Sequence, residues 1–421
     1  MKHRDKFGQG PIIRQLASRV STALLVTSLL VAPTIAAAQA TPASQATAAK
    51  SEESQEQPLT TAGGPNGYLA VRDIAAPQPL VVRGRVYIVY EISLTNFQTR
   101  PIRLTSLSAQ AGRRARLKWG GKALATMVDM PSRYGADRNA LVIPSLETRI
   151  LLIWLRAGAA GDLPARVSET VHYRFADATG GAAGMKVTTS PQAIDLSPPP
   201  VIGPPVAGRL WLAANGPSNT SGHARAFFVV QGHVYFPERF AIDFVQFGAN
   251  GMTYSGDPKK NQSYHCYGAD ALAVDDGVVV ATKDGIPENI PGSLAIPITL
   301  GNMGGNYVLL KIGRDRYAFY AHLIPGSIRV KVGQHVRRGA ILGRVGNSGN
   351  STEPHLHFHI VDGPSTLGAD AMAYEFSDAT LVPGRVELKD DDFKFVTAKR
   401  PKEKVRNSLV LENDVIDFPS R

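Results

Sequence analysis

The sequence predicts an all-β, or β-dominated, fold with an N-terminal β-sandwich and a C-terminal antiparallel β domain. Large apolar residues recur at every second position, and the 3.6-residue spacing of a helix is weak throughout the chain. The alternation is clearest at Val86, Ile88, Tyr90, Ile92 and Leu94. With 421 residues, 43% of them hydrophobic, and 40 glycines, the chain is long enough for two or three domains with their own cores.

Residues 1–40 have the pattern of a secretory signal peptide. Five basic residues precede or flank a short apolar run, and residues 38–40 (AQA) match a signal-peptidase cleavage site. The alternative is an uncleaved membrane anchor, but the run is short for a bilayer span and contains Pro33. We therefore expect an exported protein, periplasmic or at the cell surface, with no membrane span after signal cleavage.

The net charge and the cysteine content limit the classes of partner that we expect the protein to bind. Removing residues 1–40 takes away five basic residues and one acidic residue, so the formal net charge falls from +11 to +7. A basic exported protein fits an anionic polymer such as the cell wall, although a solvated basic surface without a partner is equally consistent. The sequence has no dense stripe of Lys and Arg residues with aromatic residues between them, so we do not expect the protein to bind nucleic acid. The single cysteine, Cys266, is expected to be a small buried residue, with metal ligation as the alternative.

The composition divides the rest of the chain into further parts. Residues 41–65 are poor in large apolar residues and predict a flexible linker. Apolar strand patterns such as RILLIWL (149–155) predict an immunoglobulin-like sandwich. The expected boundaries are 66–195 for the sandwich, 196–207 for a proline-rich linker, 208–375 for the second β domain and 376–421 for a charged, loosely attached C-terminal tail. Within that tail, residues 407–418 could add one strand.

The stretch TEPHLHFHI places three histidines at alternate positions, His355, His357 and His359. In a strand, such positions project from one face while the apolar residues between them face the core. Neutral histidine is a common nitrogen ligand of zinc, and a second histidine nearby can move protons. A group of surface histidines without a function is the alternative for this stretch taken alone.

Further motifs precede these histidines. The segment YAHL (320–323) carries His322, and residues 330–349 follow the pattern V-x-x-G-x-x-V-x-x-G-x-x-[IL]-G-x-x-G-x-[ST]-G before HLH at 355–357. In these motifs the chain resembles the lysostaphin and LytM-type zinc endopeptidases, which cut peptide bonds in bacterial peptidoglycan. The resemblance covers residues 239–368. It implies a LytM-type fold, a duplicated hybrid motif, for residues 208–375.

The resemblance also implies roles for individual residues. Asp243 and His357 correspond to zinc ligands, and His322 and His355 correspond to the catalytic histidines. Three protein ligands would leave a fourth position for water, whose pKa zinc lowers toward about 7. One histidine would then take a proton while the other stabilises the oxyanion.

One position departs from the family pattern, because Arg239 stands where the first zinc-ligating histidine is expected. Arginine stays protonated and has no lone pair for a metal. In one interpretation a substitute donor completes the site, with His359 and His265 as the main candidates and His233 and Cys266 as others. In the other, the Arg239 guanidinium pairs with Asp243 and takes the place of the cation.

The motifs and the resemblance lead to two alternative functions for the second β domain, residues 208–375. The first is an exported, cell-wall-directed metallopeptidase that binds Zn²⁺ and hydrolyses the peptide stems or cross-bridges of peptidoglycan. The alternative is a catalytically degenerate module that binds peptidoglycan or regulates a cell-wall amidase. An adhesion protein that works mainly through residues 66–195 is a third interpretation, but it leaves the histidines unexplained.

Overall fold

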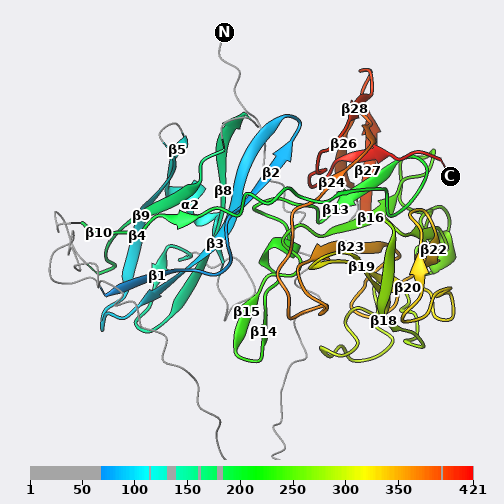
Figure 1. Cartoon of the computed structure of the whole chain (residues 1–421), viewed down its shortest axis with the longest axis horizontal. Coiled ribbons are helices and arrows are strands. Elements are labelled where there is room, and N and C mark those ends of the chain that lie inside the picture. Colours follow the sequence, from blue (N-terminus) through cyan, green and yellow to red (C-terminus); the bar gives the residue numbers. More distant parts are fainter. Residues whose placement is uncertain are drawn as a thin grey trace, which may run out of the picture.

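The structure is a computed structural model that describes residues 68–112, 115–129, 139–159, 163–177, 184–389 and 392–420. Two β bodies make up these residues, the N-terminal one on the left of Figure 1 and the C-terminal one on the right. The predicted all-β class is confirmed, because the described residues contain 29 strands and one short α-helix, α2 (Gly121–Ala125). The predicted signal peptide and the flexible linker at 41–65 lie outside the described residues.

The N-terminal body consists of two antiparallel sheets that share one core. Within the described residues, the first sheet has five strands: β1 (Leu69–Asp73), β2 (Gln78–Val82), β3 (Arg85–Asn96), β6 (Val128–Asp129) and β8 (Thr148–Ala159). The second has six: β4 (Ile102–Ala111), β5 (Ala115–Gly120), β7 (Val142–Ile143), β9 (Arg166–Phe175), β10 (Met185–Thr188) and β11 (Gln192–Ala193). Apolar residues of both sheets form a single buried cluster. The immunoglobulin-like assignment of this sandwich stays a prediction.

Strands β3 and β8 are buried on both faces. The alternating residues from Val86 to Leu94 point into the core of the sandwich, as the period of two predicts. On the opposite face, Val89 joins the core of the C-terminal body, and Ile150 and Leu152 pack against Phe236. The continuous apolar run of β8 therefore reflects burial on both sides rather than on one.

A long sheet organises the C-terminal body. Its ten strands, counted among the described residues, follow the order β21 (His335–Val336), β18 (Gly277–Lys283), β19 (Asn306–Gly313), β20 (Arg316–Leu323), β23 (Leu356–Val361), β16 (Ile242–Gln246), β13 (Trp211–Ala214), β29 (Val415–Asp417), β25 (Ala379–Leu381) and β28 (Glu403–Val405). The neighbours β20, β23 and β16 lie in the middle of this sheet and carry most of the histidine and aspartate residues singled out in the sequence.

Shorter pairs complete the body. They are β12 (Val201–Ile202) with β24 (Glu375–Phe376), β14 (Phe228–Val230) with β15 (His233–Tyr235), β17 (Asp270–Leu272) with β22 (Ile341–Arg344), and β26 (Gly384–Lys389) with β27 (Asp392–Thr397). Two 3-10 helices, η1 (His223–Arg225) and η2 (Asn261–Ser263), lie in loops. The β14–β15 hairpin lies between the two bodies in Figure 1. In the part of the chain that the structure describes, no helix has the length and apolar character needed to cross a membrane.

The C-terminal segment is part of the fold. Strand β29 pairs with β13, so that Ile416 lies opposite Trp211, and the segment buries apolar side chains such as Val405 and Phe418 in the main core. The expectation of a loosely attached tail is therefore wrong, because its charged residues are interspersed with apolar residues that face inward. The proline-rich segment is also attached, since β12 adds a parallel bridge to β24.

Arg239 joins the two bodies through an ion pair with Glu91 of β3. Arg239 Nε donates to Glu91 Oε1 at 2.7 Å, and Arg239 Nη2 donates to Oε2. Both side chains are 1% exposed. The sequence interpretation in which Arg239 pairs with Asp243 is therefore wrong. The arginine belongs to the interface between the bodies, and its partner lies 148 positions away in the chain.

This ion pair makes a stability prediction. Glu91→Ala leaves the guanidinium buried without its counter-charge, so we expect the free energy of unfolding to fall by about 3–5 kcal/mol. The double change Glu91→Leu with Arg239→Met removes both charges and should cost less than the single change. Urea denaturation followed by tryptophan fluorescence measures both.

The matched control is Arg83→Ala, which removes a more exposed pair with Asp414 between the same two bodies. We expect this control to lower the free energy of unfolding by no more than about 1 kcal/mol. A double variant as unstable as Glu91→Ala would contradict this account of the buried pair.

Candidate metal centre

Five of the ten histidines of the chain gather around one buried carboxylate, that of Asp243. Asp243 on β16 lies directly opposite His357 on β23, and Ala321 on β20 lies opposite His357 on its other side. Antiparallel pairing points directly opposed residues to the same face of the sheet. Accordingly, His357 Nδ1 lies 3.0 Å from Asp243 Oδ1.

His223 approaches the same carboxylate from outside the sheet, on η1. Its Nδ1 lies 2.9 Å from the carbonyl oxygen of Asn215. A carbonyl only accepts, so Nδ1 donates a proton to it, and Nε2 is the nitrogen that faces Asp243. Nε2 lies 3.4 Å from Asp243 Oδ2. Asn215 Nδ2 also donates to Asp243 Oδ2 at 2.9 Å, so one asparagine orients both side chains.

The donor atoms of His223, Asp243 and His357 lie within 4.8 Å of one another, which makes these residues a group that could hold a metal ion. His223 was not among the candidates predicted from the sequence, because the family pattern places the first histidine ligand four positions before Asp243. In this chain Asp243 follows His223 by twenty positions, and the β14–β15 hairpin occupies the interval. The apolar stretches on either side of QG at 231–232 were the available signal for that hairpin.

The structure does not bring the proposed substitute donors to Asp243. His265 Nε2 lies 3.2 Å from Ser255 Oγ, and His233 is exposed on β15. The thiol of Cys266 donates to the carbonyl of Pro354, and burial raises its pKa to about 12, so it is a protonated buried residue as first expected. His359 is fully buried beside the group, with Nδ1 2.9 Å from His357 Nε2.

His322 and His355 lie together on the other side of Asp243, with ring centroids 4.8 Å apart. His322 Nδ1 donates to the carbonyl of Ser348 at 2.7 Å, and His355 Nδ1 donates to that of Glu353 at 2.8 Å. Both rings therefore have Nε2 available for other partners, and His355 Nε2 lies 3.4 Å from Asp243 Oδ1. His322 has a φ of +64°, a costly conformation for a non-glycine residue that is concentrated at functional sites.

Electrostatics separates the protonation states of these groups. Burial opposes ionisation of Asp243, yet His223 and His355 and the hydrogen bonds of His355 and His357 hold its pKa well below the usual range. Burial, reinforced by His355 and His357, lowers the pKa of His322 well below the ordinary value. For His355 burial acts downward, but the Asp243 carboxylate outweighs it and the pKa is raised. The site thus combines an anion, a neutral imidazole and an imidazole that favours its cationic form.

Two glycine-containing loops support His322 from behind. A Cβ atom on Gly349 would lie 2.3 Å from the backbone nitrogen of Gly305, so the loops can meet only because both positions lack a side chain. Asn306 and Ser348 fix the contact, since the backbone nitrogen of Asn306 donates to Ser348 Oγ at 2.9 Å. The carbonyl of Ser348 that accepts from His322 is held in place by this contact.

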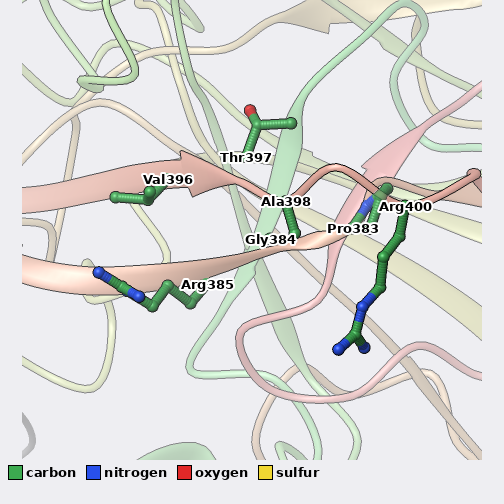
Figure 2. Close-up of a pocket in the computed structure, with 7 residues that line it drawn as sticks. All are labelled: Pro383, Gly384, Arg385, Val396, Thr397, Ala398 and Arg400. Atoms are coloured by element: carbon green, nitrogen blue, oxygen red, sulfur yellow. The ribbon is translucent and has the colours of Figure 1, made fainter.

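A surface pocket of the molecule lies elsewhere. It is lined by Pro383, Gly384 and Arg385 on one side and by Val396, Thr397, Ala398 and Arg400 on the other, at one end of the β26–β27 hairpin (Figure 2). None of the clustered histidines lines it, so the candidate chemistry lies at the centre of the long sheet and not in this pocket.

The β fold with two imidazoles and a carboxylate converging beside two further histidines defines a candidate metallohydrolase domain. Residues 263–367 match the family described as Peptidase family M23. The match confirms the predicted resemblance of this part of the chain to the lysostaphin/LytM-type peptidases. The matched residues include His322, His355 and His357 but begin after His223 and Asp243, so the structure alone brings the first two donors to the group.

The relatives share this part of the chain only. The chain is 35% identical over 91 residues to the peptidoglycan DD-endopeptidase ShyA of Vibrio cholerae, which is 21% of each protein. It is 35% identical over 92 residues to the cell division protein DipM of Caulobacter vibrioides, covering 21% of this chain and 15% of DipM. The catalytic domain of lysostaphin from Staphylococcus simulans is 26% identical, over 30% of this chain and 86% of that domain, with a TM-score of 0.18. The chain thus matches 21% of the length of ShyA and 15% of the length of DipM.

The geometry predicts that His223 is required for metal binding. We expect the full chain to hold about one zinc per chain and His223→Ala to lose it, because a catalytic zinc site needs three protein ligands. Elemental analysis after gel filtration measures the ratio. His265→Ala is the matched control and should keep the metal. Loss of zinc in His265→Ala but not in His223→Ala would show that the donors are assigned wrongly.

Glu353, next to the site, makes a pH prediction. Burial raises the pKa of its carboxyl to about 7 from an ordinary value of 4.5. The folded state therefore holds a proton that the unfolded state has lost, so this group contributes stability below about pH 4.5 that disappears as the pH rises through 7. In the metal-free chain, the melting temperature of Glu353→Gln relative to the unmodified chain should rise between pH 4.5 and 7. A constant difference across that range would contradict the raised pKa.

Proposed function

We propose that the chain is an exported zinc endopeptidase that hydrolyses peptide bonds of peptidoglycan. The observation that carries this proposal is the position of His223, which supplies the imidazole that Arg239 cannot supply. The match to Peptidase family M23 and the similarity to a peptidoglycan DD-endopeptidase support the reaction type and the substrate class. The basic charge and the signal-like sequence of residues 1–40 support a location at the cell wall, periplasmic or extracellular.

The donor set fits zinc. Two imidazole nitrogens and one carboxylate oxygen are common zinc ligands, and three protein ligands are the usual number at a catalytic site. The contacts of Asn215 with both His223 and Asp243 are the kind of support that orients metal ligands. When bound, zinc would polarise the scissile carbonyl and lower the pKa of a water molecule at the site.

His322 and His355 are proposed to divide the proton transfers. His322 is neutral and its Nδ1 proton is held by Ser348, so Nε2 can accept a proton from the attacking water. His355 keeps its Nδ1 proton on the carbonyl of Glu353, and its raised pKa favours a second proton on Nε2. That proton can be donated to the developing oxyanion. In the metal-free chain, the pKa of His322 is lowered and that of His355 is raised, which supports this division.

The competing function is a degenerate module that binds peptidoglycan or regulates a cell-wall amidase. Such a module would need neither the three donors nor the two paired histidines with their Nδ1 protons fixed. An adhesion role of the sandwich makes no use of the histidines either. The presence of three possible metal donors together with His322 and His355 around Asp243 therefore favours the enzyme.

Hydrolysis of purified peptidoglycan tests the proposal. The full chain loaded with zinc should release new amino groups, whereas His322→Ala and His355→Ala should lose about 10²- to 10⁴-fold in rate, the contribution of a general acid or base. Both variants should retain zinc, because neither residue belongs to the donor group. The control is His335→Ala, an exposed histidine on β21. A zinc-loaded chain that binds peptidoglycan but releases no amino groups would favour the degenerate module instead.

A further inference from the structure

The segment that carries His223 is held from the N-terminal sandwich. Arg225 lies two positions after His223 on η1. Its Nη2 donates to the carbonyl of Thr126 at 2.8 Å and its Nη1 to that of Val128 at 3.2 Å. Thr126 follows α2 and Val128 begins β6, so both acceptors belong to the sandwich. The same Nη2 also donates to Asn219 in the loop before His223, at 2.9 Å.

The far end of the segment is held by the same body. Arg239 lies four positions before Asp243, and its guanidinium makes the two-pronged contact with Glu91 of β3. A planar guanidinium bonded through two nitrogens to one carboxylate fixes orientation as well as distance. Two arginines of the metal-site segment therefore reach the sandwich, one on each side of the hairpin.

The hairpin between the arginines has little core of its own. Phe236, at its end, is fully buried against Ile150 and Leu152 of β8, while Val229 near its tip is 60% exposed. A two-stranded hairpin without a further apolar surface is marginally stable. The outer face of β8 supplies that surface.

The three donors are supported unequally. Asp243 and His357 lie on β16 and β23, which pair with each other in the middle of the ten-stranded sheet. His223 lies on a 3-10 helix of three residues outside that sheet. Its position depends on the loop and hairpin around it, which contact the C-terminal body at Asn215 and Asp370 and the sandwich through Arg225 and Phe236.

We propose that the N-terminal sandwich is a structural part of the metal centre, holding His223 in place through Arg225, the Arg239–Glu91 pair and the contact with β8. Glu91 and Arg225 are positioning residues, because they act on the site through the segment that carries His223. The inference rests on the metal site of the proposed function. It gives the sandwich a role that does not require it to touch the substrate.

Zinc affinity of the full chain, measured by competition with a chromophoric chelator, is the test. We expect Glu91→Gln and Arg225→Met to raise the zinc dissociation constant about 10- to 100-fold, the range for residues that orient metal ligands. The absorption spectrum of the Co²⁺-substituted chain should change in the same variants, because His223 is displaced. Gln78→Met is the matched control: it breaks hydrogen bonds to Ala371 and Ala373 across the same interface, outside the segment from Asn215 to Asp243. It should leave both readouts unchanged.

A second measurement needs no substitution and covers the case in which Glu91→Gln fails to fold. If the sandwich favours zinc binding, zinc must favour docking of the sandwich by the same free energy. Hydrogen exchange of the unmodified chain should therefore slow in peptides covering residues 121–129 when zinc is added. Slowing confined to the C-terminal body would overturn the inference.

The outcomes separate this inference from the proposed function. A full chain that binds no zinc overturns both. A chain that binds zinc without hydrolysing peptidoglycan overturns the enzyme and leaves the positioning role intact. Folded Glu91→Gln and Arg225→Met variants with unchanged zinc affinity overturn the positioning role alone.

Discussion

The buried carboxylate of Asp243 is the constraint on which the rest of the site depends. A carboxylate in the interior of a sheet is costly unless donors or cations surround it. Here Asn215 donates an amide hydrogen, and three imidazoles from β23, the turn before β23 and η1 lie within 3.4 Å of its oxygens. These partners come from two parts of the chain, residues 215–223 and residues 355–357, so satisfying one charge brings both parts to β16. The loop outside the sheet, which contains η1 and the positive φ of Asn215, supplies two of these partners to the Asp243 carboxylate.

The position of Arg239 illustrates how one departure from a family pattern can have a structural cause. An arginine four residues before Asp243 suggests a lost metal site when it is considered by itself. In the fold, its guanidinium points to Glu91 in the other body, and the imidazole beside Asp243 is that of His223, twenty positions before Asp243. The candidate metal donor and the residue that joins the two bodies are therefore different residues of one segment.

The sequence predicted the features that depend on residues close together in the chain, and it did not predict contacts between distant segments. The alternation of β3 predicted its core-facing residues, and the resemblance to the lysostaphin/LytM motifs predicted that His322, His355 and His357 gather with Asp243. His223 could not be found by a fixed spacing, because an inserted hairpin changes the distance along the chain without changing the distance in space. The partner of Arg239 lies 148 positions away, and no short-range pattern contains that information. The C-terminal segment misled for a related reason: its charges are visible in the sequence, but the pairing of β29 with β13 is not.

The hydrogen bonds also distinguish His357 from its neighbours. His223, His322 and His355 each hold their Nδ1 proton on a main-chain carbonyl, which can only accept, so the backbone fixes their tautomers. The two nitrogens of His357 face side chains instead, Asp243 Oδ1 at Nδ1 and His359 Nδ1 at Nε2. An ionised carboxylate only accepts, so His357 Nδ1 donates to Asp243 and Nε2 is left facing His359 Nδ1. His359 Nε2 is itself buried without a hydrogen-bond partner among the described residues, and burial, reinforced by His357, lowers the pKa of His359 well below its ordinary value. The nitrogen of His357 that faces the carboxylate thus carries a proton, and a cation held by Asp243 and this nitrogen would release that proton on binding.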